Sequence, residues 1–282
     1  MTGELLMRKC SIGFIGGGNM AASLIGGLVA DGCDPSSLWV SDLNNDSLQR
    51  LKKQFAINTT SDNSVVVENV DSIVIAVKPQ VVKPVAEQIG VQVRAHRTLV
   101  ISIAAGIRES DLSRWLGDGV AIVRTMPNTP AMVQTGATAL FANRYVSEQQ
   151  AELAEGVMRA VGIALWVEDE RQMDAVTALS GSGPAYFFYV MEAMINAGIA
   201  MGLEPETARL LTLQTASGAS KLAMESDDPP GLLREKVTSK GGTTEQALKV
   251  LAQGQLDKLF NSALEAARHR SEELARQYGT EA

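Results

Sequence analysis

Cysteine and histidine are scarce in this sequence, and their scarcity excludes several kinds of site. The 282 residues include two cysteines, Cys10 and Cys33, and two histidines, His96 and His269. Two cysteines are too few for a disulfide framework or a cysteine-based zinc site, so we expect two reduced thiols and no metal centre. Both histidines stand among charged residues, which is typical of solvated surface, and we expect neither to act in catalysis.

Positive charge and long apolar runs are also lacking. Lys and Arg number 25 against 32 Asp and Glu, so the net charge is −7 and the isoelectric point is about 5.0. This balance argues against a general nucleic-acid binder. The most apolar stretch, 185–201, contains Glu192 and Asn196 and falls short of the ~20 uncharged residues of a membrane span. The N-terminal residues lack the pattern of a signal peptide, so we expect a cytoplasmic protein that binds neither nucleic acid nor membrane.

The first half of the chain alternates short runs rich in Val and Ile with helical segments such as 20–31 and 47–55. Continuously hydrophobic runs are typical of strands that are covered on both faces of a parallel sheet. The pattern predicts an N-terminal Rossmann-type doubly wound, mostly parallel sheet in residues 1–167. The expected strands are 11–15, 38–41, 72–77, 99–103, 120–124, 137–141 and, less regular, 164–167.

The second half reads as helices. Ser147 and Gln150 form a capping box at the start of a helix. Residues 227–231 form a loop between two later helices. The stretch 185–201 is apolar nearly all round, so it must be buried on most sides. About 115 remaining residues give it little cover, which favours burial by a second subunit. We therefore expect residues 168–282 to form an all-α dimerisation and substrate-binding domain.

A glycine-rich turn follows the first predicted strand. Gly16, Gly18 and Ala21 fit the pattern Gly-x-Gly-x-x-Ala between a strand and an amphipathic helix. In that context Gly16 permits a tight turn, Gly18 lets backbone N–H groups approach a pyrophosphate, and Ala21 packs the helix on the sheet. The alternative is a purely structural turn.

Asp42 ends the second predicted strand, 24 residues after Gly18 (42 − 18). A carboxylate at this place in a dinucleotide-binding unit hydrogen-bonds a ribose diol and repels a 2′-phosphate, which favours NAD. The alternative is a turn or N-cap aspartate.

The usual proton donors of carbonyl reduction are missing. No tyrosine is followed four residues later by lysine, and no Cys–His pair is visible. A dinucleotide domain without a strong acid suits an imine substrate, because an imine nitrogen is basic enough to arrive protonated.

A second candidate anion site lies at residues 238–246. Two glycines and two threonines precede a helix expected over 245–259, and Thr243 with Gln246 fits a capping box. Backbone N–H groups, hydroxyls and a helix N-terminus together form an anion receptor. The alternative is an ordinary helix cap.

These residues carry a family resemblance that covers nearly the whole chain. The most specific segments are Met-Pro-Asn-Thr-Pro at 126–130 and Ser-Gly-Ser-Gly-Pro-Ala-Tyr at 180–186. With 15–20, 76–79, 102–106 and 241–244, they make the sequence similar to the pyrroline-5-carboxylate reductases, the last enzymes of proline biosynthesis.

The resemblance implies an oxidoreductase that reduces 1-pyrroline-5-carboxylate to L-proline with NADPH or NADH, as a homodimer that can assemble further. It implies that the substrate carboxylate and ring are held by Ser239, Gly241, Gly242, Thr243 and Thr244, with Thr244 on the ring nitrogen as the catalytic residue. It implies cofactor contacts from Gly16, Gly18, Asn19, Met20, Asn63, Ala76, Val77, Lys78, Pro79 and Ala105, to which our own interpretation adds Asp42.

Two positions depart from the family pattern. Lys240 stands where many members have proline, and Asp42 stands where NADPH-preferring members usually have a small or basic residue. Two other functions remain open. A β-hydroxyacid dehydrogenase would carry a catalytic lysine where this chain has Phe187. A non-catalytic NAD(P)-sensing scaffold would bind the dinucleotide without turnover.

Overall fold

The computed structural model describes residues 11–280, and the chain divides into two compact units. The first unit holds the described residues up to Ser182 together with those from Ala267 onward, and the second unit holds Gly183–Ala266. The predicted boundary after residue 167 remains a prediction. In space, α8 (Gln172–Val176) and the end of α13 (Leu256–Thr280) belong to the unit that contains the sheet.

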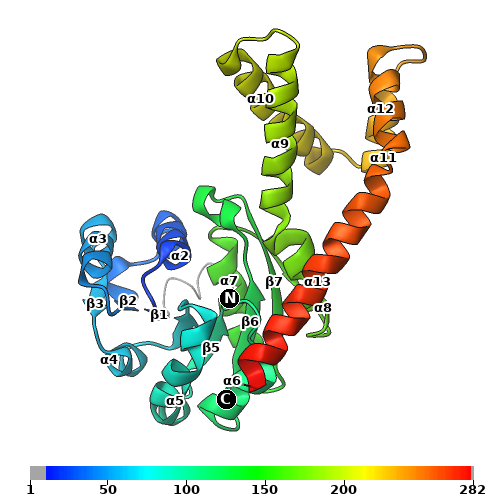
Figure 1. Ribbon diagram of the computed structural model, residues 1–282. Helices are drawn as coiled ribbons and strands as arrows, with labels where there is room; N and C mark the ends of the chain where they lie inside the picture. Colours follow the sequence, from blue (N-terminus) through cyan, green and yellow to red (C-terminus); the bar gives the residue numbers. More distant parts are fainter. Residues whose placement is uncertain (1–10, 281–282) are drawn as a thin grey trace. The chain divides into compact units, whose positions relative to one another are not determined.

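An eight-stranded sheet forms the centre of the first unit, in the order β3-β2-β1-β4-β5-β6-β7-β8 (Figure 1). The strands from β3 across to β6 are parallel, β7 runs antiparallel to β6, and β8 runs parallel to β7. This confirms the predicted mostly parallel Rossmann-type sheet. The bounds are β1 Ile12–Ile15, β2 Leu38–Ser41, β3 Asn58–Thr60, β4 Ser72–Ile75, β5 Leu99–Ser102, β6 Ile122–Met126, β7 Gly136–Ala142 and β8 Gly162–Trp166.

Alternate residues of the strands fill two separate hydrophobic cores. Phe14 of β1 lies in the core beneath α2 and α7, whereas its neighbour Ile15 lies in the core beneath α4, α5 and α6. Both faces of the sheet are therefore covered, as the continuous hydrophobic runs predict. The covering elements are α2 Asn19–Ala30, η1 Pro35–Ser37, α3 Asn45–Phe55, α4 Asn63–Glu68, α5 Pro79–His96, α6 Glu109–Leu116, η2 Thr129–Val133, α7 Glu148–Arg159 and, after α8, η3 Thr177–Gly181.

Local signals set several of these boundaries. The Ser147 hydroxyl accepts from the Gln150 N–H at 3.2 Å, and the Gln150 side chain accepts from the Ser147 N–H at 3.0 Å, so the predicted capping box is confirmed.

Cys33 is buried and its burial raises the pKa of the thiol, while Cys10 lies outside the described residues.

The last turns of α13 return to the first unit, and Figure 1 shows this red end beside α6. The buried Ser271 hydroxyl donates to a carboxylate oxygen of Asp174 on α8 at 2.6 Å. The Arg114 guanidinium donates to the Gly279 carbonyl at 2.9 Å. These contacts fix the C-terminal segment to the sheet's helical cover.

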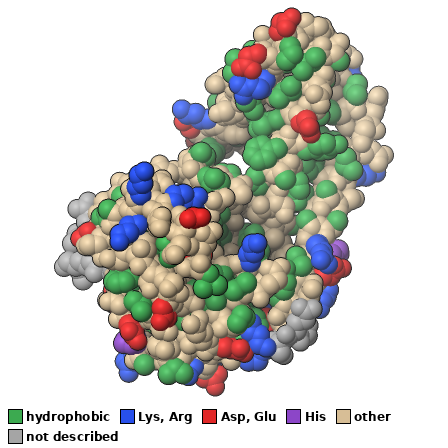
Figure 2. Space-filling view, turned by 60° about the vertical axis from the view of Figure 1, so that its left-hand side comes forward, with side chains coloured by type: hydrophobic (Ala, Val, Ile, Leu, Met, Phe, Trp, Pro, Cys, Tyr) green, Lys and Arg blue, Asp and Glu red, His purple; other side chains and the backbone are tan. Residues whose placement is uncertain are grey.

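The second unit contains only helices among its described residues: α9 Gly183–Ala200, α10 Pro205–Glu225, α11 Pro230–Lys236, α12 Thr243–Gln253 and the first part of α13. The helix expected over 245–259 is wrong, because α12 stops before Gly254 and Gln255 takes a left-handed conformation, with φ of 54°. Large apolar side chains of α9 are exposed, including Phe187 and Phe188 at 63% and Tyr189 at 74%. Figure 2 shows hydrophobic side chains on the surface of the helical unit. In a single chain, α9 is therefore exposed, although the sequence predicts that it is buried. Across residues 11–280, no helix combines the length and the apolarity that crossing a bilayer requires.

Candidate active site

Four strands end side by side and bring their loops to one edge of the sheet. The register pairs Ile15 at the end of β1 with Ser41 of β2 on one side and Ile75 of β4 on the other, and Ile75 with Ser102 of β5. Backbone bonds continue past the strand ends, from the Gly16 N–H to the Ser41 carbonyl at 2.8 Å and from the Ala76 N–H to the Ile15 carbonyl, also at 2.8 Å. Ligands of open α/β sheets bind at this carboxyl edge.

The glycine-rich turn has different requirements at its two outer glycines. Gly16 has φ of +104°, and a Cβ there would lie 2.7 Å from the Ala76 carbonyl oxygen and 3.0 Å from a Val77 methyl group. Gly16 is therefore needed for the fold itself. Gly18 is the N-cap of α2 with φ of −73°, and a Cβ there would meet no atom within 4 Å.

Gly18, as the N-cap of α2, provides no side-chain cap for the helix. The first N–H groups of a helix have no acceptor within the helix, and they carry the positive end of its dipole. Gly18 and Asn19 are exposed, and Met20 is half-buried. The turn therefore offers open backbone donors to an anion, which fits a dinucleotide pyrophosphate.

Asp42 turns its carboxylate back onto the same glycine-rich turn. Its Oδ2 accepts from the Gly17 N–H at 2.7 Å, and its Oδ1 accepts from the Asn44 N–H at 2.8 Å. Asn44, not Asp42, caps α3, because the Asn44 side chain accepts from the N–H groups of Asp46 and Ser47. Asp42 is thus a turn residue that also contacts the glycine-rich turn.

The remaining predicted cofactor residues lie along the same edge. Asn63 begins α4, where its Oδ1 accepts from the Ser41 hydroxyl at 2.7 Å and its Nδ2 donates to Gln88 at 2.9 Å. The loop after β4 contains Ala76, Val77 and Lys78, Pro79 begins α5, and Ala105 lies in the loop after β5. Lys78 is the N-cap of α5 and makes no side-chain cap. The structure therefore brings all the predicted cofactor residues to one edge of one unit.

The predicted substrate residues lie in the second unit, at the start of α12. Gly241 has φ of +75°, its N–H donates to the Glu245 carboxylate at 2.9 Å, and the Gly242 N–H donates to the Ser239 carbonyl at 3.0 Å. Gly242 is the N-cap, so the predicted capping box of Thr243 with Gln246 is wrong.

This correction leaves the first turn of α12 without a side-chain cap. The N–H groups of Thr243 and Thr244 therefore keep the open donors that an anion receptor needs. Ser239, Lys240, Gly241 and Thr243 are exposed, and Thr244 is half-buried.

Comparison with known proteins identifies the family. Residues 170–274 match the family model for pyrroline-5-carboxylate reductase dimerisation, and residues 11–106 match the model for NADP oxidoreductase, coenzyme F420-dependent. A pyrroline-5-carboxylate reductase of Pseudomonas aeruginosa is 48% identical over 97% of this chain and 100% of its own length. The chain belongs to the pyrroline-5-carboxylate reductase family.

Two solved structures of this family agree with the fold. The reductase from Coxiella burnetii has 47% identity and a TM-score of 0.91, covering 94% of this chain and 98% of its own. The enzyme from Plasmodium falciparum, solved with NADP bound, has 30% identity and a TM-score of 0.84, covering 95% and 99%. The family confirms the predictions of an oxidoreductase and of NADPH or NADH as cofactor, and it supports a homo-oligomer. Membership of this family excludes the alternative of a β-hydroxyacid dehydrogenase. The roles of the individual residues remain predictions.

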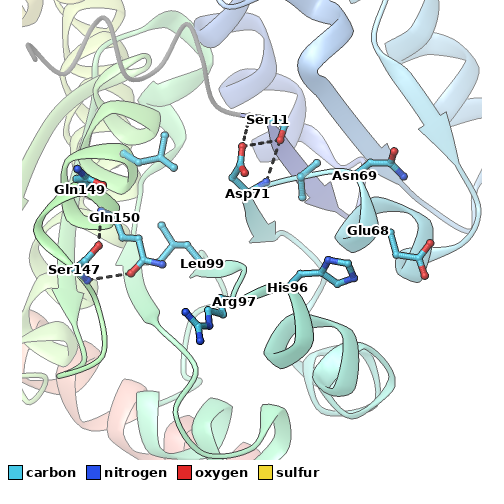
Figure 3. Close-up of a pocket in the computed structure, with 12 residues that line it drawn as sticks. Ser11, Glu68, Asn69, Asp71, His96, Arg97, Leu99, Ser147, Gln149 and Gln150 are labelled. Carbon is cyan, nitrogen blue, oxygen red and sulfur yellow. Dashed lines mark hydrogen bonds between the residues drawn. The ribbon is translucent and has the colours of Figure 1, made fainter.

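A cavity of about 780 Å³ lies elsewhere in the reductase's first unit (Figure 3). Ser11 precedes β1, Asp71 precedes β4 and Leu99 begins β5, so the cavity opens at the amino ends of these strands, opposite the glycine-rich turn. Asp71 accepts from the Ser11 hydroxyl at 2.9 Å. His96 is exposed there, and His269 is exposed on α13, as predicted for solvated surface residues.

Sequence reasoning missed one supporting group of the reductase's cofactor edge. Arg124 of β6 is buried and donates to Glu170 Oε1 at 2.8 Å, and the same oxygen accepts from the Glu109 N–H at 2.6 Å. Glu109 begins α6, directly after the loop of Ala105, so this pair anchors the end of that loop. A signal existed: a charge inside a strand that is covered on both faces requires a buried partner.

Proposed function

We propose that this protein reduces 1-pyrroline-5-carboxylate to L-proline, the last step of proline biosynthesis. The observation that carries the proposal is the similarity to a pyrroline-5-carboxylate reductase over 97% of the chain. The geometry supports it, because the glycine-rich turn, Asp42 and the loop of Ala76 meet at one edge of the sheet. A cytoplasmic location remains a prediction.

The residues at the cofactor edge fit a nicotinamide dinucleotide. Gly18 leaves open the space that a side chain would fill, beside the uncapped N-terminus of α2. Gly16, Gly18, Asn19 and Met20 would hold the pyrophosphate; Asn63, Ala76, Val77, Lys78, Pro79 and Ala105 would line the cleft. When bound, NADH or NADPH supplies the hydride that the C=N carbon requires.

The start of α12 would bind the substrate. Its open N–H groups and the hydroxyls of Ser239 and Thr243 suit a carboxylate, and Lys240 adds a cation beside them. The hydroxyl of Thr244 would hydrogen-bond the ring nitrogen and orient the imine. Since that nitrogen is basic enough to arrive protonated, the residues need only position it and exclude water, and no strong acid is required.

A second copy of the chain would cover the apolar helices. Phe187, Phe188 and Tyr189 expose well over half of their surface, an arrangement that water disfavours strongly. The dimerisation region of the family spans these residues. We propose a homodimer that can assemble further, and sedimentation that shows a stable folded monomer at low micromolar concentration would exclude it.

The test is the initial rate of NADH and of NADPH oxidation with 1-pyrroline-5-carboxylate, measured in parallel. Turnover with either dinucleotide, dependent on the imine, is expected. Folded protein that binds a dinucleotide without any turnover would support the sensing scaffold instead.

A further inference from the structure

The C-terminal end of α13 touches the start of α5 and the loop after β5, beside residues to which cofactor binding is assigned. The ring of Tyr278 packs on Gly106, where a Cβ would lie 3.2 Å from its Cδ2 and 3.4 Å from the Cβ of Leu274. The Tyr278 hydroxyl accepts from the Gln80 side-chain amide at 3.1 Å. Gly106 follows Ala105 directly, and Gln80 follows Pro79, so each contact lies one residue from a predicted cofactor residue.

The contact with Tyr278 constrains the loop at Gly106. Gly106 is buried and has φ of +74°, a conformation in which other residues are strained. A side chain at this position would displace the tyrosine ring, and the ring in turn blocks movement of the loop toward α13. The other end of the loop is fixed at Glu109 by Glu170.

Tyr278 is itself held firmly. It packs against the hydrophobic core beneath α4, α5 and α6, and the next residue, Gly279, accepts from Arg114 at 2.9 Å. A Cβ on Gly279 would lie 2.8 Å from the Asp111 carboxylate, so the helix end sits closely on α6. A rigid support of this kind can fix the loops that rest on it.

We infer that Tyr278 is a positioning residue for the dinucleotide: it links the start of α5 to the loop after β5 and holds both in the arrangement that binds the cofactor. The inference rests on the proposed function, since it assumes that these loops line the cofactor cleft. Its contacts with Gln80 and Gly106 lie in the first unit, beside residues assigned to the cofactor, so we expect Tyr278 to act on cofactor affinity.

The test measures the dissociation constants of NADH and NADPH by fluorescence titration, with the KM of each substrate alongside. Tyr278→Phe keeps the ring and removes the hydroxyl, and Gln80→Ala removes the same hydrogen bond from the other side. Each is expected to weaken dinucleotide binding about two- to tenfold, with the KM for 1-pyrroline-5-carboxylate unchanged within twofold. The double variant should lose no more than the larger single loss, because both changes break one bond.

Two controls separate positioning from stability. Tyr145→Phe makes the same chemical change at an exposed tyrosine that bonds Arg144. Ser271→Ala removes the buried bond to Asp174 on the same helix, so it should lower the melting temperature without changing dinucleotide affinity.

Affinities in Tyr278→Phe and Gln80→Ala equal to that of Tyr145→Phe would overturn the inference. An equal loss in Ser271→Ala would also overturn it, because the effect would then follow general stability. Failure of the proposed function looks different, since the unchanged protein would then show no imine-dependent turnover, whatever the dinucleotide affinities of the variants.

Discussion

Replacing Gly18 with serine is expected to weaken dinucleotide binding without harming the fold. The backbone of Gly18 has φ of −73° and ψ of −174°, which any residue adopts, and its Cβ direction is open. Serine is a better N-cap than glycine by a few tenths of a kcal/mol, because its hydroxyl accepts from the first turn. The melting temperature of Gly18→Ser should therefore equal or slightly exceed that of the unchanged protein.

The same hydroxyl would compete with the pyrophosphate. It would occupy the open space above Gly18 and would accept from an N–H group of α2 that the phosphate needs. A hydrogen bond to a charged group contributes about 1.5–3 kcal/mol, so losing one such bond weakens binding by roughly 10- to 150-fold. Stability and affinity would thus move in opposite directions.

Calorimetric titration with NADH and NADPH, together with thermal unfolding, measures both quantities. Gly16→Ala is the matched control: its φ of +104° and the 2.7 Å approach to the Ala76 carbonyl predict a loss of about 1–3 kcal/mol in folding stability. If Gly18→Ser binds both dinucleotides as tightly as the unchanged protein, the turn is not the pyrophosphate site and the reasoning fails.

Three further predictions concern single side chains. Asp42→Asn removes a charge that would repel a 2′-phosphate by roughly 1–3 kcal/mol, so the ratio of kcat/KM for NADPH to that for NADH should rise; an unchanged ratio would place the carboxylate away from the ribose. Thr244→Ala should cost about 1–3 kcal/mol in kcat/KM, and Thr244→Ser should recover most of it; equal kinetics in all three proteins would remove this hydroxyl from the mechanism. Glu170→Gln leaves the buried Arg124 without its ion pair, so urea unfolding should show a loss of about 1–3 kcal/mol, less than for a fully buried pair because the glutamate side chain is 21% exposed.

The parallel part of the sheet was predictable because its strands are buried on both faces. Burial on both faces requires unbroken Val and Ile runs, and such runs are visible in a sequence. β3 gave no such signal: Asn58–Thr60 is a three-residue polar strand at the sheet edge, and only its pairing with β2 makes it a strand. Edge strands are partly solvated, so hydrophobicity does not mark them.

The start of α12 shows why a cap motif alone was misleading. Thr243 and Gln246 have the spacing of a capping box, but Gly242 takes the N-cap position after the left-handed Gly241. Gly241 has φ of 75°, a conformation that favours glycine, and the turn it makes places Gly242 at the N-cap. The missing capping box supports the interpretation as an anion receptor, because a capping box would have used backbone N–H groups that a carboxylate needs.

Contacts between distant segments had no local signal at all. The bond between Gln80 and Tyr278 joins residues that are 198 positions apart, and neither belongs to a recognisable motif. The exposure of α9 has a related cause. Its apolar sequence predicts burial, yet its large side chains are exposed in the single chain; the expected second subunit, which the match to a dimerisation family supports, would account for this exposure.

The two interpretations of Asp42, as a turn residue and as a ribose ligand, support one another physically. Its carboxylate already accepts from Gly17 in the glycine-rich turn, so its position is fixed by the loop that would hold the pyrophosphate. Each carboxylate oxygen has a further lone pair that can accept from a hydroxyl. A ribose diol would therefore meet an acceptor held at a set distance from the phosphates, whereas a 2′-phosphate would have to displace it and disturb the turn. On this argument Asp42 would favour NADH over NADPH, and the ratio of the two kcat/KM values in Asp42→Asn tests this prediction.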